Sequence, residues 1–376
     1  MKLKSKKPRV LVAMSGGVDS SVAALLLKKQ GYEVIGAFMK NWSDTKNDLG
    51  ECTWKDDRKV AMAIASKLEI PLITLDFEKE YRNQVVQPMF NSYRKGITPN
   101  PDVDCNNKVK FPLLWKTAKK LKADFIATGH YARIKKIMGT KDVNNKKSST
   151  LDYSIKNFSR GWVGEHFGFD YLNINNKDKV REGKETNFEL LRARDESKDQ
   201  SYFLYRLVES DLEHTIFPIG DYTKKQVREI ARKNKFPNFN RKSTVGICFI
   251  GKVNLKQFLQ KKIKPKSGKI LSPEGKIIGQ HDGIYYYTLG QRIGSRFGIE
   301  VDKGPGIVKR WYVASKNLKR NEIIAAPEGH KLFYKKEIFL KNPHWINQAP
   351  KKNLKVKSRI RQVGELLPSK LSYNKR

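Results

Sequence analysis

Residues 10–31 have the sequence VLVAMSGGVDSSVAALLLKKQG, and this stretch decides the fold of the N-terminal part of the chain. The apolar run predicts a buried strand over 10–14, and the following pattern predicts a helix over 20–30, closed by Gly31. The turn between them holds two glycines, an aspartate and three serine hydroxyls. Such a turn binds anions, because unpaired N–H groups and the positive end of the helix point at the ligand. We therefore expect a phosphate-binding loop.

Two common phosphate-binding loops do not fit this turn. A Walker loop needs GxxxxGK followed by Ser or Thr, and no such lysine is present; a dinucleotide fingerprint needs GxGxxG, whereas Gly16 and Gly17 are adjacent. SGGVDS instead resembles the pyrophosphatase loop (PP-loop) of the N-type ATP pyrophosphatases, which binds the pyrophosphate end of ATP while an acceptor is adenylated. This resemblance implies that Asp19 helps to hold magnesium and the phosphates.

The charge of the chain favours a polyanionic partner. There are 76 Lys and Arg against 38 Asp and Glu, which gives a formal net charge of +38. Nucleic acid fits best, since basic residues spread along the chain can follow a phosphate backbone and release its counterions. A membrane surface is a weaker alternative, because no basic helix with a clean apolar face is evident. Genome composition bias toward Lys and Asn is the alternative explanation of the excess.

Cysteine usage and hydropathy favour a soluble cytoplasmic protein. Cys52, Cys105 and Cys248 are far apart and odd in number, which argues against a secreted disulfide framework and against an obvious zinc site. The apolar run near the N-terminus is too short for a signal peptide, and no stretch approaches the length of about 20 apolar residues that spans a bilayer.

The first 130 residues alternate short apolar strands with helical stretches, which is typical of an α/β fold. Further strands are expected over 32–39, 72–77 and 124–128, and helices over 56–68, 78–95 and 108–121. This order predicts a mostly parallel sheet with helices on both faces and with ligands at the carboxyl ends of its strands.

The remaining chain divides by composition. Residues 134–187 are polar with an aromatic patch, and we expect an inserted surface excursion. Its aromatic residues could stack on bases, but packing of the insert onto its own domain is the favoured interpretation. With length as a guide, the expected domains are a PP-loop domain over 1–208, a small central helical domain over 209–267 and a final β domain over 268–376, for which the family resemblance given below implies a β-barrel, possibly truncated.

The two distant thiols Cys105 and Cys248 remain ambiguous when judged from their neighbours. Cys105 lies in TPNPDVDCNNKVKF, where a following helix N-terminus and Lys108 would favour the thiolate, whereas Asp102 and Asp104 would disfavour it. Cys248 lies in STVGICFIGK, and by itself it fits a small buried hydrophobic residue better than a reactive group. Cys52 fits a packed thiol, and we assign it no chemistry.

The PP-loop alone leaves several enzymes open, including the synthetases of argininosuccinate, GMP, NAD and lysidine. A series of motifs in one order narrows the choice: SGGVDSSV, MKNW, TPNPDVDCN, ATGHYAR, KDQSYFLY, FPIGDYTKKQVREIA, STVGICFIG, YYTLGQR and WYVASK. This series resembles the bacterial tRNA-specific 2-thiouridylases from the N-terminus to about residue 315, with weaker matching beyond.

The resemblance implies roles for matched residues. The nucleotide site would comprise Ala13, Met14, Ser15, Gly16, Gly17, Val18, Asp19, Ser20, Ser21, Met39 and Gly129. Residues that meet the target base or other parts of tRNA would be Asn100, Pro101, Asp102, His130, Lys198, Asp199, Gln200, Arg359 and Gln362. The central domain would also bind tRNA. Without the resemblance, His130 would be an ordinary histidine at a strand end.

The resemblance also implies the chemistry. ATP, with Mg²⁺, would adenylate the C2 oxygen of the wobble uridine, because that oxygen is a poor leaving group. A persulfide on Cys248 would supply sulfur, directly or after reduction to hydrosulfide, and the nucleophile Cys105 would form a transient disulfide with Cys248. Asp102 would act as general acid or base. The implied partners are tRNA and a cysteine desulfurase or sulfur-relay protein, with the chain acting as a monomer.

Two departures from the family pattern stand out: the excursion before KDQ is long, and the C-terminal barrel ends early, with Ile360 at an expected aromatic position. A barrel without its last strands would expose a sheet edge, so either the fold closes differently or the chain is truncated. Another PP-loop adenylating synthetase, or a tRNA-binding protein with impaired turnover, are the alternative functions.

Overall fold

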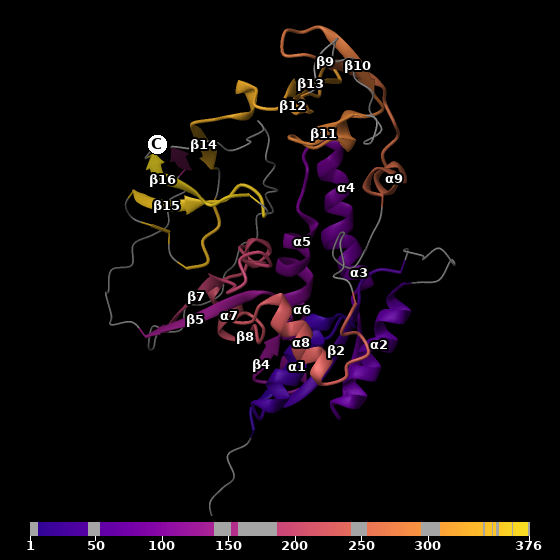
Figure 1. The fold of residues 1–376 in the computed structure, drawn as a ribbon, viewed down its shortest axis with the longest axis vertical. Coiled ribbons are helices and arrows are strands. Elements are labelled where there is room, and N and C mark those ends of the chain that lie inside the picture. Colours follow the sequence, from indigo (N-terminus) through magenta and orange to yellow (C-terminus); the bar gives the residue numbers. More distant parts are fainter. Residues whose placement is uncertain are drawn as a thin grey trace, which may run out of the picture.

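The fold is seen in a computed structural model that describes residues 7–43, 53–138, 152–156, 186–241, 254–294, 309–340, 343–347, 349–350, 353–362 and 364–374. A parallel sheet lies at one end of the molecule, with strand order β3-β2-β1-β4-β8 (Figure 1). Its strands are β1 (Arg9–Ala13), β2 (Glu33–Lys40), β3 (Leu72–Asp76), β4 (Phe125–Ala127) and β8 (Thr215–Ile216). The strand order reverses between β1 and β4, which is where open parallel sheets bind ligands.

Alternate residues of β1 pack on opposite faces of this sheet, as the two-residue period of a strand requires. Val10 and Val12 belong to a core that they share with the helices α1 (Val18–Lys29), α2 (Thr53–Lys67) and α8 (Lys224–Lys233). Leu11 and Ala13 belong to a second core, which contains α6 (Phe111–Lys120). Helices therefore cover both faces, and the predicted α/β class is confirmed.

Two long helical runs each contain a π-helical segment. The first comprises α3 (Glu78–Tyr81), η1 (Arg82–Val86) and α4 (Gln87–Arg94), and the second comprises α5 (Pro101–Asp104), η2 (Cys105–Lys110) and α6.

The second run corrects the prediction that a helix begins after Cys105. Asn100 caps the helix, since its side chain accepts a hydrogen bond from the Val103 N–H at 3.3 Å, and Pro101 suits the first turn. Cys105 thus lies one turn inside a helix instead of before its N-terminus.

Two further sheets lie at the other end of the molecule (Figure 1). One has the order β10-β9-β13-β12-β11. It comprises β9 (Gly268–Leu271), β10 (Ile277–His281), β11 (Arg292–Ile293), β12 (Trp311–Asn317) and β13 (Glu322–Pro327). The other has the order β14-β6-β16-β15 and is antiparallel throughout. It comprises β6 (Asp152–Lys156), β14 (Glu337–Leu340), β15 (Leu354–Ser358) and β16 (Leu367–Asn374). The prediction of a β-rich C-terminal domain is confirmed.

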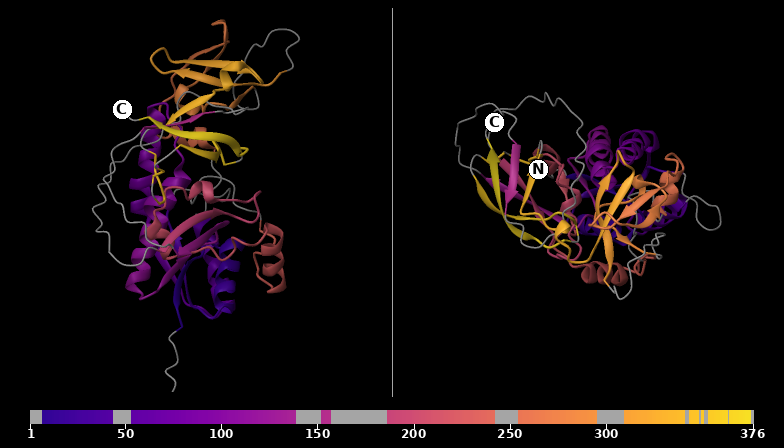
Figure 2. Two further views of the ribbon diagram at one scale, coloured as in Figure 1. Left: turned by 90° about the vertical axis from the view of Figure 1, so that its left-hand side faces the viewer. Right: turned by 90° about the horizontal axis from the view of Figure 1, so that it is seen from above.

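Strand β6 comes from the predicted excursion. That excursion leaves and re-enters the N-terminal domain through β5 (Ala132–Met138) and β7 (Thr186–Arg192), which pair with each other in antiparallel register. Between them, β6 pairs with β14 on one side and β16 on the other, so this part of the excursion is a central strand of a C-terminal sheet. Figure 2 shows the same arrangement from two further directions. The aromatic patch of the excursion, over 162–171, lies outside the described residues.

The segment that the sequence assigned to a small central domain is shared between neighbours. Its strand β8 extends the parallel sheet beside β4, and Val227 and Ala231 of α8 join the core around β1. Its last helix, α9 (Leu255–Gln260), packs Phe258 and Leu259 into the core that contains the C-terminal strands β12 and β13. A short helix, α7 (Glu209–Glu213), precedes β8, and 3₁₀ turns lie at Ser201–Phe203, Ile284–Tyr286 and Lys331–Phe333. The boundaries at residues 208 and 267 remain predictions.

Candidate nucleotide and thiol site

The predicted phosphate loop lies at the carboxyl end of β1, at the point where the strand order reverses. Its serine hydroxyls hold its shape. The Ser20 Oγ donates to the Gly17 carbonyl at 3.1 Å and accepts from the Ser15 N–H at 3.2 Å, and the Ser21 Oγ donates to the same carbonyl at 2.9 Å. The loop is thus ordered by its own side chains. The first N–H groups of a helix have no partner within the helix, so those of α1 can bind an anion at this turn.

Two glycines are required by close backbone packing. Gly16 has φ of +74°, and a Cβ there would lie 2.3 Å from the Asp57 carbonyl oxygen. A Cβ on Gly129, after β4, would lie 2.6 Å from the backbone nitrogen of Ser20. Neither position tolerates a side chain without a shift of the backbone, and Gly129 lies directly against the first turn of α1. Its place in the nucleotide site remains a prediction.

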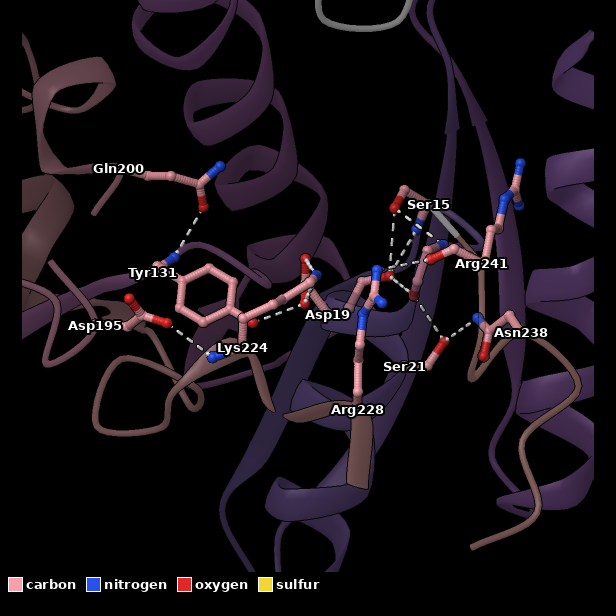
Figure 3. Close-up of polar contacts among 12 residues, drawn as sticks. Ser15, Asp19, Ser21, Tyr131, Asp195, Gln200, Lys224, Arg228, Asn238 and Arg241 are labelled. Atoms are coloured by element: carbon pink, nitrogen blue, oxygen red, sulfur yellow. Dashed lines mark hydrogen bonds and ion pairs between the residues drawn. The ribbon is translucent and has the colours of Figure 1, made fainter. Parts of the chain in front are cut away.

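Asp19 in the first turn of α1 is the centre of a polar network (Figure 3). Its Oδ1 accepts a hydrogen bond from the Tyr131 hydroxyl at 2.9 Å, and both of its carboxylate oxygens lie 2.7 Å from the Lys224 Nζ. Burial, together with the neighbouring Asp19 carboxylate, raises the pKa of Tyr131 well above its usual value, so this hydroxyl remains a donor. The Lys224 ammonium also lies 5.7 Å from the centre of the Tyr131 ring.

A segment after α8 closes the other side of the loop. The buried Asn238 donates from Nδ2 to the Gly16 carbonyl at 2.9 Å and to the Ser21 Oγ at 3.1 Å (Figure 3). Arg241 donates to the same carbonyl at 3.3 Å and forms an ion pair with Asp57 of α2. Sequence reasoning missed Lys224, Asn238 and Arg241, because more than 200 residues separate them from the loop.

The expected adenine side of the site is apolar. Met14, which ends the β1 run, and Met39, near the end of β2, are both buried, and the Met14 N–H donates to the Ala37 carbonyl at 2.8 Å. Asn41 follows β2 and is 1% exposed, yet neither atom of its amide has a hydrogen-bond partner among the described residues. Sequence reasoning did not single out Asn41, although it lies in the MKNW motif.

Cys105 is 0% exposed and packs in a hydrophobic core with Trp42, Tyr81, Val85 and Val109. The adjacent Asp104 is also buried, and its Oδ1 lies 2.8 Å from the Lys108 Nζ and 3.6 Å from an Arg206 guanidinium nitrogen. Lys108 is therefore paired with Asp104, one turn away, as residues spaced by four on a helix allow. Asn100, Pro101 and Asp102 are half-buried on the same helical run.

His130 lies between this helical run and the end of β4. Its Nδ1 is 2.7 Å from the Thr128 Oγ1, its Nε2 is 3.5 Å from the Lys110 Nζ, and its ring stacks on Phe111 with centroids 6.0 Å apart. Burial lowers the pKa of His130 well below its usual value, and the positive charge of Lys110 acts in the same direction. His130 is therefore neutral near pH 7, so any contact that it makes with RNA uses hydrogen bonds instead of positive charge.

The KDQ motif contains one exposed and two inward-facing residues. Lys198 is exposed, whereas Asp199 is 1% exposed and accepts hydrogen bonds from the Ala193 N–H at 3.1 Å and the Ser201 Oγ at 3.0 Å. The Gln200 Oε1 accepts from the Tyr131 N–H at 2.9 Å, which joins this motif to the Asp19 network (Figure 3).

The two predicted C-terminal tRNA residues meet this motif. Arg359 lies with its Nη1 3.3 Å from the Asp199 Oδ2, and the Gln362 Nε2 donates to the Asp199 carbonyl at 3.3 Å. Arg359 and Gln362 are about 160 positions from Asp199 in the sequence, yet both contact it in the structure. Cys248 and Cys52 lie outside the described residues.

The fit of a magnesium ion can be judged from the carboxylates. Within the described part of the chain, no group of three or more His, Cys, Asp and Glu residues could hold a metal ion. Magnesium in nucleotide sites usually binds one or two carboxylates together with the phosphates and waters, so Asp19 fits as the protein ligand of a nucleotide-bound ion.

Comparison with known families defines the class of the protein. The family model described as tRNA methyl transferase HUP domain matches residues 8–159 and 155–252, and the model described as tRNA methyl transferase PRC-barrel domain matches residues 256–327. The chain therefore combines a HUP domain, which contains the parallel sheet and the phosphate loop, with a PRC-barrel domain, which contains β9 to β13.

Individual relatives narrow the class. Proteins named tRNA-specific 2-thiouridylase from Coxiella burnetii, Geobacillus kaustophilus and Methylobacillus flagellatus are 41%, 40% and 38% identical to this chain. The matches cover 95%, 91% and 95% of this chain and 85%, 78% and 86% of the relatives. The chain belongs to the tRNA-specific 2-thiouridylase family. Among its described residues, no helix combines the length and the apolar character that crossing a membrane requires.

Proposed function

We propose that this chain is an ATP-dependent tRNA sulfurtransferase that converts the wobble uridine of tRNA to 2-thiouridine and releases AMP and pyrophosphate. The chain belongs to this family, and one structural observation supports the proposal. A continuous path of hydrogen bonds and an ion pair runs from Asp19 in the phosphate loop through Tyr131 to Gln200, and the adjacent Asp199 binds Arg359. The residues proposed to bind ATP and those proposed to bind tRNA therefore form one connected unit.

The first step is adenylation. The C2 oxygen of uracil attacks the α-phosphorus of ATP, the bond to the β-phosphate breaks, and pyrophosphate leaves. The loop at 15–21 accommodates that leaving group, because N–H groups at the start of α1 and the helix dipole favour negative charge. Magnesium bound with ATP supplies charge neutralisation, and Asp19 would hold it. The buried Met14 and Met39 would line the adenine side.

The second step transfers sulfur. The terminal sulfur of a persulfide on Cys248 attacks C2, and AMP leaves with the former C2 oxygen. The Cys105 thiolate then attacks the Cys248 Sγ, which breaks the persulfide bond, leaves sulfur on C2 and forms a Cys105–Cys248 disulfide that an external thiol reduces. Asp102, on the turn before Cys105, is proposed to move the protons. A cysteine desulfurase or a relay protein would renew the persulfide.

The burial of Cys105 places a condition on this mechanism. The thiol is 0% exposed and belongs to a hydrophobic core that also contains Trp42 and Tyr81, so it reacts only after neighbouring side chains move. An apolar environment also disfavours the thiolate. We propose that entry of the target base beside Asn100 and Asp102 accompanies this movement, which would keep the nucleophile protected until substrate is bound.

The test is mass spectrometry of tRNA nucleosides after incubation with ATP, a persulfide donor and the protein. We expect 2-thiouridine with the wild type and none with Cys105→Ala or Cys248→Ala. Cys52→Ala is the matched control, because Cys52 has no assigned chemistry, and it should remain close to wild type. Retained thiolation in both active-site variants would reject the assigned roles. If no tRNA is thiolated but the protein consumes ATP with a small acid as the acceptor, another adenylating synthetase is favoured.

A further inference from the structure

Lys224 is the first residue of α8, and its side chain reaches back to the phosphate loop. The Nζ lies 2.7 Å from both carboxylate oxygens of Asp19, although 205 residues separate the two along the chain (Figure 3). The pair is only partly exposed, with 15% of the lysine side chain and 31% of the aspartate side chain accessible to solvent. Lys224 therefore forms an ion pair with the carboxylate that would bind the magnesium ion of the nucleotide.

The backbone of Lys224 is held independently of this ion pair. Its N–H donates to the Asp195 Oδ2 at 2.9 Å, and Thr223 caps the helix, with its N–H donating to the Gln226 Oε1 at 2.8 Å. Because these bonds do not involve the lysine side chain, the ammonium can move on its flexible four-carbon stem while its Cα stays in place.

Charge balance indicates where the ammonium goes when nucleotide binds. The Asp19 carboxylate lies in the loop proposed to bind phosphate, and Lys224 neutralises it. A magnesium ion on Asp19 would repel the ammonium, while the adjacent pyrophosphate would attract it. Lysine serves as a phosphate-binding cation in other loops of this general kind.

Resting on the proposed function, we propose that Lys224 is a phosphate-binding residue with two positions. In one position it pairs with Asp19, as the structure shows. In the other it contacts the pyrophosphate group of ATP when magnesium and nucleotide bind. Lys224 thereby distinguishes ATP from AMP and frees Asp19 for the metal.

Arg228 supports this assignment. It lies one turn after Lys224 on the same face of α8, and Figure 3 shows its guanidinium directed at the loop. Its Nε is buried and has no hydrogen-bond partner among the described residues. Its Nη2 lies 3.5 Å from the carbonyl of Arg241, which belongs to the segment that closes the loop, so two cations of α8 lie close to the segments around the phosphate loop.

The experiment compares the affinities of ATP and AMP in the presence of magnesium, measured by isothermal titration calorimetry. Lys224→Met should weaken ATP binding about 10- to 100-fold, as expected for loss of a charge-assisted hydrogen bond, and should change AMP binding by less than about twofold. Lys224→Arg, which keeps the charge, should restore most of the ATP affinity. Lys225→Met is the matched control, since Lys225 is the exposed neighbour on the same helix, and it should bind ATP like the wild type.

The outcomes separate the two proposals. A wild type that binds no ATP would overturn the proposed function itself. If the wild type binds ATP and Lys224→Met either binds it equally well or loses ATP and AMP affinity to the same extent, the lysine is only a structural ion pair and the inference is wrong. Lys224→Gln provides a second variant if the methionine variant does not fold.

Discussion

At the scale of single residues, motif positions assigned to tRNA also hold the fold together. Asp199 is almost fully buried and accepts hydrogen bonds from its own loop while it pairs with Arg359. Loss of its carboxylate would leave Arg359, which is mostly buried, without this partner. A defect in tRNA binding after substitution of Asp199 could therefore arise because the KDQ loop and the segment that contains Arg359 separate, as well as from loss of a direct contact with RNA.

Lys316 is a second inward-facing charge, and it gives a prediction that depends on pH. Its Nζ donates to the Gly96 carbonyl at 2.6 Å and to the Tyr287 carbonyl at 2.9 Å, and burial lowers its pKa from 10.5 to about 8. The unfolded chain binds a proton at this lysine up to about pH 10.5, whereas the folded chain releases it from about pH 8. The contribution of Lys316 to the free energy of unfolding must therefore rise with pH across this window.

We expect the difference in unfolding free energy between the wild type and Lys316→Met to rise by about 1 to 3 kcal/mol from about pH 7.5 to about pH 10. Urea unfolding at the two pH values measures it. Lys319→Met, which changes an exposed lysine near the same hairpin, should show no such rise. A difference that does not vary with pH for Lys316→Met would mean that the buried ammonium is not destabilised in the fold.

At the scale of secondary-structure elements, β6 makes the two ends of the chain interdependent. A five-residue strand from the excursion within the HUP domain is hydrogen-bonded on both edges by C-terminal strands. The excursion therefore supplies an interior strand of the C-terminal sheet, in which β6 joins β14 to β16 and β16 pairs with β15.

A proline in this strand tests that dependence. Ser154 is paired with Phe339 on one side and Ser372 on the other, so Ser154→Pro removes a backbone donor from the middle of a sheet. Hydrogen exchange over residues 367–374 should become at least about tenfold faster, while exchange in β1 should be unchanged. Ser154→Thr retains the N–H and suits a strand, so it should keep the protection. Unchanged exchange in the proline variant would contradict the pairing.

The local elements were predictable from sequence, whereas the long-range contacts were not. The strand over 10–14, the loop and the helix that follows were found to within about two residues, because hydrophobic periodicity and the glycine-rich turn are local signals. The prediction that the helix near Cys105 begins at residue 108 is wrong, because Asn100 caps it and Pro101 is its first residue. The pairing of β6 and the contact of Lys224 with Asp19 join segments far apart in sequence, and no periodicity records such partners.

At the scale of the whole molecule, net charge and connectivity bear on tRNA binding. The formal charge of +38 is spread over a chain whose N-terminal phosphate loop and C-terminal sheets are linked through Tyr131, the KDQ motif and Arg359. A tRNA molecule engaging both ends would meet two regions that are joined by hydrogen bonds and an ion pair. Such binding should be governed by the release of counterions from the RNA.

We expect the affinity for tRNA to fall by roughly 10³-fold or more between about 50 and 200 mM salt, as it does when at least about six phosphates are contacted. Fluorescence anisotropy with labelled tRNA measures the slope. Lys198→Gln, at the exposed position of the KDQ motif, should reduce the slope by about one ion. Lys29→Gln changes an exposed lysine at the end of α1 remote from the loop, and it should leave the slope unchanged. A flat response to salt would contradict the argument from charge.

The central claim is that this chain activates the C2 oxygen of uridine with ATP, and isotope transfer tests it most directly. A tRNA carrying ¹⁸O at C2 of the wobble uridine should be incubated with the protein, ATP and a persulfide donor, and the AMP released should be analysed by mass spectrometry. The account predicts one ¹⁸O atom in AMP for each 2-thiouridine formed. Unlabelled AMP alongside 2-thiouridine would show that the oxygen leaves by another route and would contradict the account.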